Sequence, residues 1–418
     1  MKTRALPALP SSLRRLNERA VLQRLRRLGT ATRADLAKAI GISQPTAGKI
    51  IGELLACGLL EELDESAGVL SGHGPEPRRL GRPGRLIRLD AVHPRFLGIE
   101  LGVEQTRLAP LPLTVSETPA ETREFATGNN PEVWARQLRQ HATALSAERL
   151  WGALVSVPGV VDEAAGRVLY SPNLHWTEQV HLAELIGKAC TLPVLLVQEI
   201  RALALGHQSA TPKADDFLLV DFGEGVGGAV IEGGQLFSHP LPLSAELGHT
   251  PVPGNPRLCG CGAHGCVETL LARRALAESF GRDDLAALAE AIEREGLPPW
   301  LRDALQAMGT VIAGALNVLG LRRVVITGHL TQLPPLVVAT LAEAVRRGAM
   351  WARFGEVVCE AAPRRRLAGL VAAGLDRLLF PASRSSPLQQ AARQRMRRTP
   401  RGAPAEKPAP RTRASTEL

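Results

Sequence analysis

Four residues in one short stretch of the chain have the types and spacing of a metal site. Cys259, Cys261 and Cys266 lie within eight residues, and His249 precedes the first of them by ten residues. Three thiolates and an imidazole complete the tetrahedral shell that Zn²⁺ prefers, and a shell without an open position is typical of a structural ion. We therefore predict that these four residues bind Zn²⁺, with His264, inside the same stretch, as the competing imidazole.

A disulfide, or three unrelated thiols, is the alternative to a metal site. The first residues of the chain are basic but lack the apolar core of a secretion signal. The sequence also lacks the run of about 18 apolar residues that a membrane span needs. We therefore expect a cytoplasmic protein without a membrane partner, and disulfides seldom persist in that compartment. The other cysteines stand isolated among apolar residues and are predicted to be core thiols: Cys57, Cys190 and Cys359.

The stretch from Glu246 to Glu268 reads ELGHTPVPGNPRLCGCGAHGCVE. Its ELGH followed by CGCGAHGCVE resembles the signature of the ROK family of sugar kinases and sugar-responsive repressors, in which a metal shapes a loop beside a sugar pocket. The resemblance extends over about residues 15 to 380. It implies that Glu246, His249 and Glu268 contact sugar hydroxyls, and that His249 also binds the metal.

Positive charge is concentrated at the two ends of the chain. The 418 residues have a net charge of +9; residues 1–92 and 381–418 each contribute +7, whereas residues 93–380 are net −5. Basic ends around an acidic body suggest a polyanionic partner for the ends alone. The length favours two or three domains. We expect one domain over 13–92, a second over 93–380, and a disordered basic tail over 381–418, where apolar periodicity is absent.

The first domain has the pattern of a helix-turn-helix. Apolar residues recur at helical spacing in the first 28 residues. Thr32 has the character of an N-cap for a second helix, and Ser43 that of an N-cap for a third, with Pro45 in its first turn. Two capped helices joined by a short turn at Gly41 predict a helix-turn-helix.

In such a motif the start of the second paired helix enters the major groove of DNA. Gln44, Thr46 and Lys49 are the polar residues clustered there. A following loop ends PRRLGRPGRLIRL; read as a β-hairpin, it makes the domain a winged helix, in which Arg82 and Arg85 would contact phosphates or the minor groove. This first domain, residues 13–92, is called the head below. It also resembles the winged-helix domain of ROK repressors. The alternative is a three-helix packing module, such as a dimerisation domain, that binds no nucleic acid.

The second domain carries further segments that resemble the family, and the resemblance implies an α/β body of two actin-like lobes. The segment YSPNL at 170–174 implies that Asn173 binds a sugar hydroxyl; a simple turn asparagine is the alternative. In LPVLLVQEIRALALGH, Gln198 stands at the family's sugar-binding Asn and Glu199 at its catalytic Asp. A glutamate carboxylate lies one methylene further out, and such misplacement is costly to catalysis, so we expect a weak or absent base.

Two loops that contact ATP phosphates in sugar kinases depart from the kinase pattern. The first reads ELGVE at 100–104 and the second GEG at 223–225, so that Glu104 and Glu224 stand where the kinases have a hydroxyl. A carboxylate repels the phosphate that backbone amides would otherwise bind, which argues against ATP. The PRRR segment at 363–366 is interpreted as a solvated turn.

Together these features predict a winged helix-turn-helix joined to a two-lobed actin-like body. The predicted function is that of a sugar-responsive transcriptional regulator, with repression favoured, and not that of an enzyme. A sugar or sugar phosphate would bind between the lobes and shift the geometry of a homodimer, or of a dimer of dimers, on a palindromic DNA operator. Two alternatives stay open: an ATP-dependent sugar kinase that also binds DNA, and a zinc-stabilised scaffold that has lost sugar binding.

Overall fold

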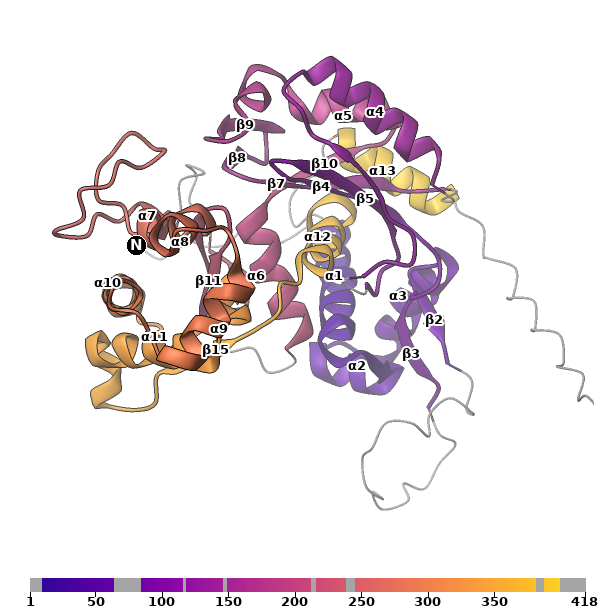
Figure 1. The fold of residues 1–418 in the computed structure, drawn as a ribbon. Coiled ribbons are helices and arrows are strands. Elements are labelled where there is room, and N and C mark those ends of the chain that lie inside the picture. The colour runs from indigo at the N-terminus through magenta and orange to yellow at the C-terminus, as the bar shows by residue number, and fades with distance from the viewer. Residues whose placement is uncertain are drawn as a thin grey trace, which may run out of the picture.

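The computed structural model describes residues 10–63, 84–115, 118–145, 149–211, 216–237, 245–380 and 387–398 (Figure 1). These ranges form a mixed α/β protein with a head that contains a three-stranded sheet, and two larger lobes that each contain a five-stranded sheet. No helix in these ranges combines the length and the apolar character needed to cross a bilayer.

The head consists of three helices and an antiparallel sheet. The helices are α1 (Pro10–Leu28), α2 (Arg33–Ile40) and α3 (Gln44–Ala56), and the sheet has the order β1 (Thr30–Thr32), β3 (Leu86–Leu89), β2 (Leu60–Glu62). Both predicted N-caps are confirmed, because the Thr32 side chain accepts a hydrogen bond from Asp35 N at 3.2 Å and the Ser43 side chain accepts one from Thr46 N at 3.4 Å.

Strands β2 and β3 pair antiparallel, as expected for the two strands of a wing. Arg82 falls within residues 64–83, between these strands, so the prediction for that arginine lies outside the described residues.

The two lobes contain sheets with the same plan. The first sheet has the order β10 (Val194–Gln198), β7 (Gly152–Val157), β4 (Phe96–Leu101), β5 (Gln105–Leu111), β6 (Arg123–Ala126). The second has the order β15 (Val358–Ala361), β14 (Arg323–Gly328), β11 (Phe217–Phe222), β12 (Val226–Glu232), β13 (Gln235–Leu236). In each sheet three parallel strands are followed by two antiparallel ones. This duplication is the predicted two-lobed arrangement.

Helices pack on both lobes. In the first lobe, α4 (Pro131–Thr143) and α5 (Leu182–Cys190) share a core with the sheet, beside the small hairpin of β8 (Val160–Asp162) and β9 (Arg167–Tyr170). In the second lobe, five helices surround a separate core: α7 (Glu268–Leu271), α8 (Arg273–Phe280), α9 (Leu285–Glu295), α10 (Pro299–Leu319) and α11 (Pro335–Gly348).

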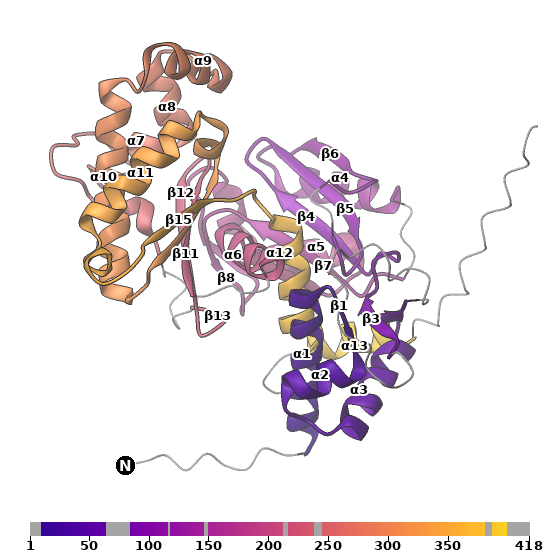
Figure 2. The same cartoon turned by 90° about the horizontal axis from the view of Figure 1, so that it is seen from below.

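Two helices, α6 (Glu199–Ala210) and α12 (Arg366–Ala373), cross between the two sheets (Figure 2). The two helices approach closely at Gly369, where a Cβ would lie only 1.7 Å from the carbonyl oxygen of Ala202. Helix α6 contributes Leu205 to the core cluster of the first lobe and Leu203 to a cluster with the second sheet. These two helices therefore connect the lobes.

The head shares a hydrophobic core with the first lobe. Val21 of α1, Ile51 of α3 and Ile87 of β3 belong to one cluster with Phe96 and Trp151 of the lobe. The head is therefore packed on the body rather than attached by a linker alone.

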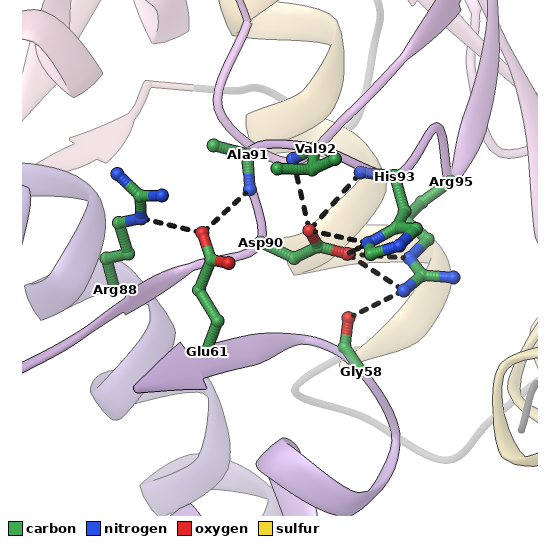
Figure 3. A network of polar contacts seen from close by, with 8 residues as sticks. All are labelled: Gly58, Glu61, Arg88, Asp90, Ala91, Val92, His93 and Arg95. Carbon is green, nitrogen blue, oxygen red and sulfur yellow. Dashed lines mark hydrogen bonds and ion pairs between the residues drawn. The ribbon is translucent and has the colours of Figure 1, made fainter. Parts of the chain in front are cut away.

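A network of hydrogen bonds around Asp90 fixes the segment that joins the head to the body (Figure 3). The Asp90 carboxylate accepts from the backbone N–H groups of Val92 and His93, and from Arg95 Nη2 at 2.8 Å. Arg95 also donates to the carbonyl oxygen of Gly58, in the head, at 3.2 Å. Burial alone would raise the pKa of Asp90, but these donors outweigh it and hold the pKa below its usual value.

Replacing Asp90 with Asn should weaken this junction. Arg95, whose side chain is 7% exposed, would lose its counter-charge, and removing one partner of a buried pair costs about 3–5 kcal/mol. Because the folded pKa of Asp90 is lowered, the advantage of the wild type should be complete above the unfolded Asp pKa of about 3.9 and shrink as the pH falls through the lower folded value. Urea unfolding at several pH values measures this difference in free energy.

His93→Asn is the matched control for the Asp90 variant. The His93 side chain is 51% exposed, so its ion pair should contribute less than about 1 kcal/mol. Equal losses in the two variants would contradict the central place of Asp90 in the junction.

The C-terminal segment departs from the prediction. Residues 387–398 form helix α13 (Pro387–Arg398), so the expectation of disorder over 381–418 is wrong for this part. Ala392 and Met396 are four residues apart, share one face of the helix, and are buried in the cluster that joins the head to the first lobe. The sequence did not indicate this helix, because its short apolar face lies among many arginines and glutamines. The rest of the segment lies outside the described residues.

Candidate metal centre and ligand site

The four predicted metal ligands meet at one point. The ligand atoms of His249, Cys259, Cys261 and Cys266 all lie within 4.8 Å of one another. Cys259 Sγ is 3.5 Å from His249 Nδ1, and Cys261 Sγ is 3.7 Å from Cys266 Sγ. Tetrahedral zinc with Zn–S of about 2.3 Å and Zn–N of about 2.0 Å separates its ligands by about 3.5–3.8 Å, so the donor set fits such an ion. His264 is exposed and outside the group.

The loop folds tightly to bring these ligands together. Gly265 has a φ of +84°, which a residue with a side chain rarely adopts. The Asn255 side chain donates to the carbonyl oxygen of Cys266 at 3.2 Å and to Thr269 Oγ1 at 2.9 Å. These bonds fix the returning arm of the loop against α7.

The thiols of this group ionise unevenly without a cation. Burial raises the pKa of Cys259 to about 12 and also raises that of Cys266, whereas the backbone N–H of Ala263 lowers the pKa of Cys261. Cys259 and Cys266 therefore need a positive partner in order to ionise, and a metal ion would supply that charge. All six cysteines are free thiols. Cys261 Sγ and Cys266 Sγ lie 3.7 Å apart, well beyond the disulfide length of about 2.05 Å, so the disulfide alternative does not fit.

Four residues predicted to bind sugar lie together beside the metal site: Gln198, Glu246, His249 and Glu268. The Gln198 side chain lies near enough to Glu246 to lower the pKa of its carboxyl, and Glu246 Oε2 is 4.0 Å from His249 Nε2. Glu268 Oε2 accepts from Val226 N at 2.9 Å. Burial raises the pKa of Glu246, and Glu268 adds to this effect, while His249 and Gln198 oppose it. Acceptors and donors from separate segments thus converge beside the imidazole.

The other two predicted sugar contacts have different surroundings. Asn173 is exposed and follows Pro172, whose Cβ lies 3.7 Å from the position of a Cβ at Gly260 in the metal loop. Glu199, at the family's catalytic position, is bound by the guanidinium group of Arg366. Asn173 is therefore near the metal loop, whereas Glu199 is already engaged.

Two arginines from the segment interpreted as a solvated turn pair with carboxylates of the body, so that interpretation is wrong. Arg366 donates to Glu100 Oε1 at 2.9 Å, in β4, and to Glu199, at the start of α6. Arg364 donates to Asp221 Oδ1 at 2.7 Å and to its Oδ2 at 3.0 Å, in β11. Burial opposes the charge of Arg366, but Glu199 and Glu100 outweigh it and raise its pKa. The overlooked signal was a basic run inside an acidic body.

The glycine loop at residues 223–225 contacts both Arg364 and Glu268. A Cβ at Gly223 would lie 2.7 Å from Arg364 Nη2, and a Cβ at Gly225 would lie 2.6 Å from Glu268 Oε2. Glu224, between them, is exposed, as is Glu104 in the first loop. The loop therefore touches both Arg364 and the predicted sugar site.

The predicted DNA-contacting residues lie in the first two turns of α3 and are exposed. Gln44, Thr46 and Lys49 are all exposed, whereas one face of the helix is buried in the head. The Arg85 side chain is 61% exposed and pairs with Glu62 at 2.9 Å, at the start of the wing. The head therefore presents a polar helix start and a basic side chain to solvent.

Comparison with known proteins extends these observations. The model of the ROK family matches residues 96–373. A xylose repressor from Caldicellulosiruptor bescii is 25% identical over 272 residues, which cover 63% of this chain and 65% of that protein. An N-acetylmannosamine kinase from Salmonella newport is 30% identical over 193 residues, which cover 46% of this chain and 65% of that protein. The chain thus spans slightly less than two thirds of the length of these relatives.

A solved structure shares the fold over nearly the whole chain. It is a ROK family transcriptional regulator, a homologue of the Escherichia coli Mlc protein, and it superposes with a TM-score of 0.66 at 18% identity. The superposition covers 92% of this chain and 98% of that chain. Because the family model matches well over half of the residues, this chain belongs to the ROK family.

Proposed function

We propose that the protein is a sugar-responsive transcriptional regulator that acts as a repressor. The head, residues 13–92, would bind a double-stranded DNA operator, and the body, residues 93–380, would bind a sugar or sugar phosphate. The similarity to a xylose repressor supports this proposal.

The observation that carries the proposal is the exposed polar start of α3 on a head that shares its core with a ROK body. Residues at the start of a recognition helix reach the base edges in the major groove, and Gln44, Thr46 and Lys49 occupy that position. The shared core and the Asp90 network give the body a rigid connection through which it can move the head.

The effector would bind beside the metal loop. Glu246, His249 and Glu268 would contact sugar hydroxyls, with Gln198 holding Glu246 and Asn173 at the margin. We propose that the metal is Zn²⁺, since three sulfurs and one imidazole form its preferred donor set. The ion would fix the orientation of His249 and the course of the loop.

The same arrangement disfavours sugar-kinase chemistry. A kinase needs a carboxylate that is open to take a proton from the sugar hydroxyl, and Glu199 is bound by Arg366. Glu104 and Glu224 place negative charge on the two loops that would accept phosphate. An ATP-dependent sugar kinase that also binds DNA is the alternative, which the similarity to an N-acetylmannosamine kinase supports.

We also propose a homodimer, or a dimer of dimers. A single winged helix buries little surface on DNA, and two heads on one palindromic operator would double it. A change in the relation of the two lobes would then alter the spacing of the heads.

The variant with Gln44→Ala, Thr46→Ala and Lys49→Ala should lose specific DNA binding. Each base contact contributes about 1–3 kcal/mol, so the affinity should fall about 100-fold or more. Duplexes are first selected from a random-sequence pool with the wild-type protein, and the affinity is then measured by fluorescence anisotropy. Arg294→Ala, at an arginine whose side chain is 72% exposed on α9, is the matched control. Equal affinity of the two variants would contradict the assignment of α3.

A thermal-shift panel of sugars and sugar phosphates, each with and without Mg·ATP, separates the alternatives. A regulator should be stabilised by one ligand, with no further effect of ATP, because a ligand that binds the folded state stabilises it by mass action. Stabilisation by ATP alone, or sugar-dependent consumption of ATP, would favour the kinase. A panel without any stabilising sugar would favour a scaffold.

A further inference from the structure

A cavity of about 1000 Å³ lies where the head meets the first lobe. Its wall is built from α1 of the head, the turn between β8 and β9, and parts of α5, α6, β10, β13 and the π-helical turn η6 (Gly374–Leu379). None of the residues predicted to bind metal or sugar lines it. Sites for small metabolites have volumes of about 300–1,000 Å³, so the cavity is large enough for such a ligand.

The wall of this cavity has an excess of positive charge. Six arginine and lysine side chains and four aspartate and glutamate side chains line it, which leaves a net charge of +2. Arginines predominate on α1, which contributes three of them: Arg19, Arg26 and Arg27.

The carboxylates of the wall are already shared among these cations. Asp376 pairs with Arg26 at 3.2 Å and with Arg19 at 3.6 Å. Glu163 pairs with Arg377, and with Arg201 at 3.6 Å.

The remaining charged groups of the wall are satisfied locally. Glu184 lies 3.8 Å from Lys188 and 3.7 Å from His181. Asp162 accepts from the backbone of its own turn. Within the described ranges, Arg27 therefore has no carboxylate partner in the cavity.

Several guanidinium N–H groups lack acceptors in the described part of the chain. They are Nε and Nη1 of Arg26 and Nε of Arg201, whose side chains are 11% and 16% exposed. Burial lowers the pKa of Arg201, and Glu163 offsets this only in part. A buried N–H without an acceptor is unfavourable. Small rotations toward an oxyanion would supply acceptors, and the guanidinium fork matches the geometry of phosphate.

We propose that this cavity is a second effector site, which binds a small molecule that carries a phosphate group. The phosphate lies between Arg26 and Arg27 on the head and Arg201 and Arg377 on the body, and apolar side chains of β10 contact the rest of the ligand. Because the ligand bridges α1 and the first lobe, it fixes the head against the body. The effect on DNA binding rests on the proposed function, whereas the binding itself does not.

Isothermal titration calorimetry of the full-length protein tests the site. The probes are inorganic phosphate and glycerol 3-phosphate, with glycerol as the uncharged counterpart and the ionic strength held constant with sodium chloride. Both phosphates should bind saturably and glycerol should not. Arg27→Gln and Arg201→Gln should each weaken binding about tenfold or more, since a charge-assisted contact is lost. Arg274→Gln, at a side chain on α8 that is 87% exposed, should leave the affinity unchanged.

Two results would overturn the proposal. One is the absence of saturable phosphate binding, or binding that Arg27→Gln and Arg201→Gln leave unchanged. The other is loss of phosphate binding in Glu246→Gln, which would place the phosphate at the predicted sugar site instead. Arg27→Gln breaks no ion pair with a described carboxylate, so this variant should fold. Phosphate binding as expected in a protein that selects no DNA duplex would contradict the proposed function and leave the cavity site supported.

Discussion

His249→Gln should release the proposed zinc ion and lower the melting temperature of the protein by about 10 °C. His249 would complete the proposed tetrahedral shell, and structural zinc contributes about 10–16 kcal/mol of folding free energy in isolated zinc-finger peptides. A loss of about 4 kcal/mol is enough, because each kcal/mol shifts the melting temperature of a large domain by about 2–4 °C. Elemental analysis should show about one zinc per chain in the wild type and almost none in the variant, and differential scanning calorimetry measures the shift.

His264→Gln is the matched control for this prediction. His264 lies in the same loop but is exposed and outside the ligand group, so the variant should keep its zinc and most of its stability. Cys359→Ser, in β15, tests a cysteine remote from the site in the same way. Zinc loss in both histidine variants, or a wild-type protein purified without zinc under metal-replete conditions, would contradict the assignment.

Arg366→Gln should cost about 2–4 kcal/mol of unfolding free energy. The variant leaves Glu100 and Glu199 facing each other without a counter-charge, and breaking a buried ion pair is strongly unfavourable. The Arg366 side chain is 23% exposed, so solvent screening should keep the loss toward the lower part of the range for buried pairs. Urea unfolding at neutral pH measures it.

A second substitution identifies the cause of that loss. Adding Glu199→Gln to Arg366→Gln removes one of the two repelling charges, so the double variant should recover part of the stability. A double-mutant cycle gives the coupling free energy between the two residues, which should be about 1 kcal/mol or more for a direct pair. Additive losses would mean that Arg366 does not hold Glu199 in solution.

The metal loop and the helix starts could be predicted from sequence because their determinants are local. All four predicted ligands lie between His249 and Cys266, and the requirements of Zn²⁺ restrict which residue types can serve as its ligands. The N-caps at Thr32 and Ser43 likewise depend on a hydroxyl three residues from the N–H that it accepts from. In such segments the local sequence pattern is enough to predict the local structure.

Contacts between distant segments could not be predicted in this way. Arg366 and Glu100 are 266 residues apart, and nothing in the PRRR segment indicates which carboxylates it will meet. The same is true of α13, where the pairing of Arg393 with Glu18 of α1 joins residues 375 positions apart. From sequence alone, a basic segment is interpreted as solvated because its partners are unknown. The three-dimensional structure is needed to identify those partners.

The cavity between the head and the first lobe shows the same limit. Arg27 belongs to a helix predicted for the head, whereas Arg201 follows the predicted sugar-site residues Gln198 and Glu199. Only the packing of the head on the body brings their helices to one wall.

The measurement that tests the central claim most directly is the affinity for a selected DNA duplex with and without the sugar that stabilises the protein. Fluorescence anisotropy at fixed salt gives both affinities, and a fixed salt concentration is needed because DNA binding depends strongly on it. We expect the sugar to change the affinity by about 5-fold or more, the range of typical allosteric coupling. Sugar binding that leaves the DNA affinity unchanged would contradict the proposal that a sugar bound to the body changes DNA binding by the head.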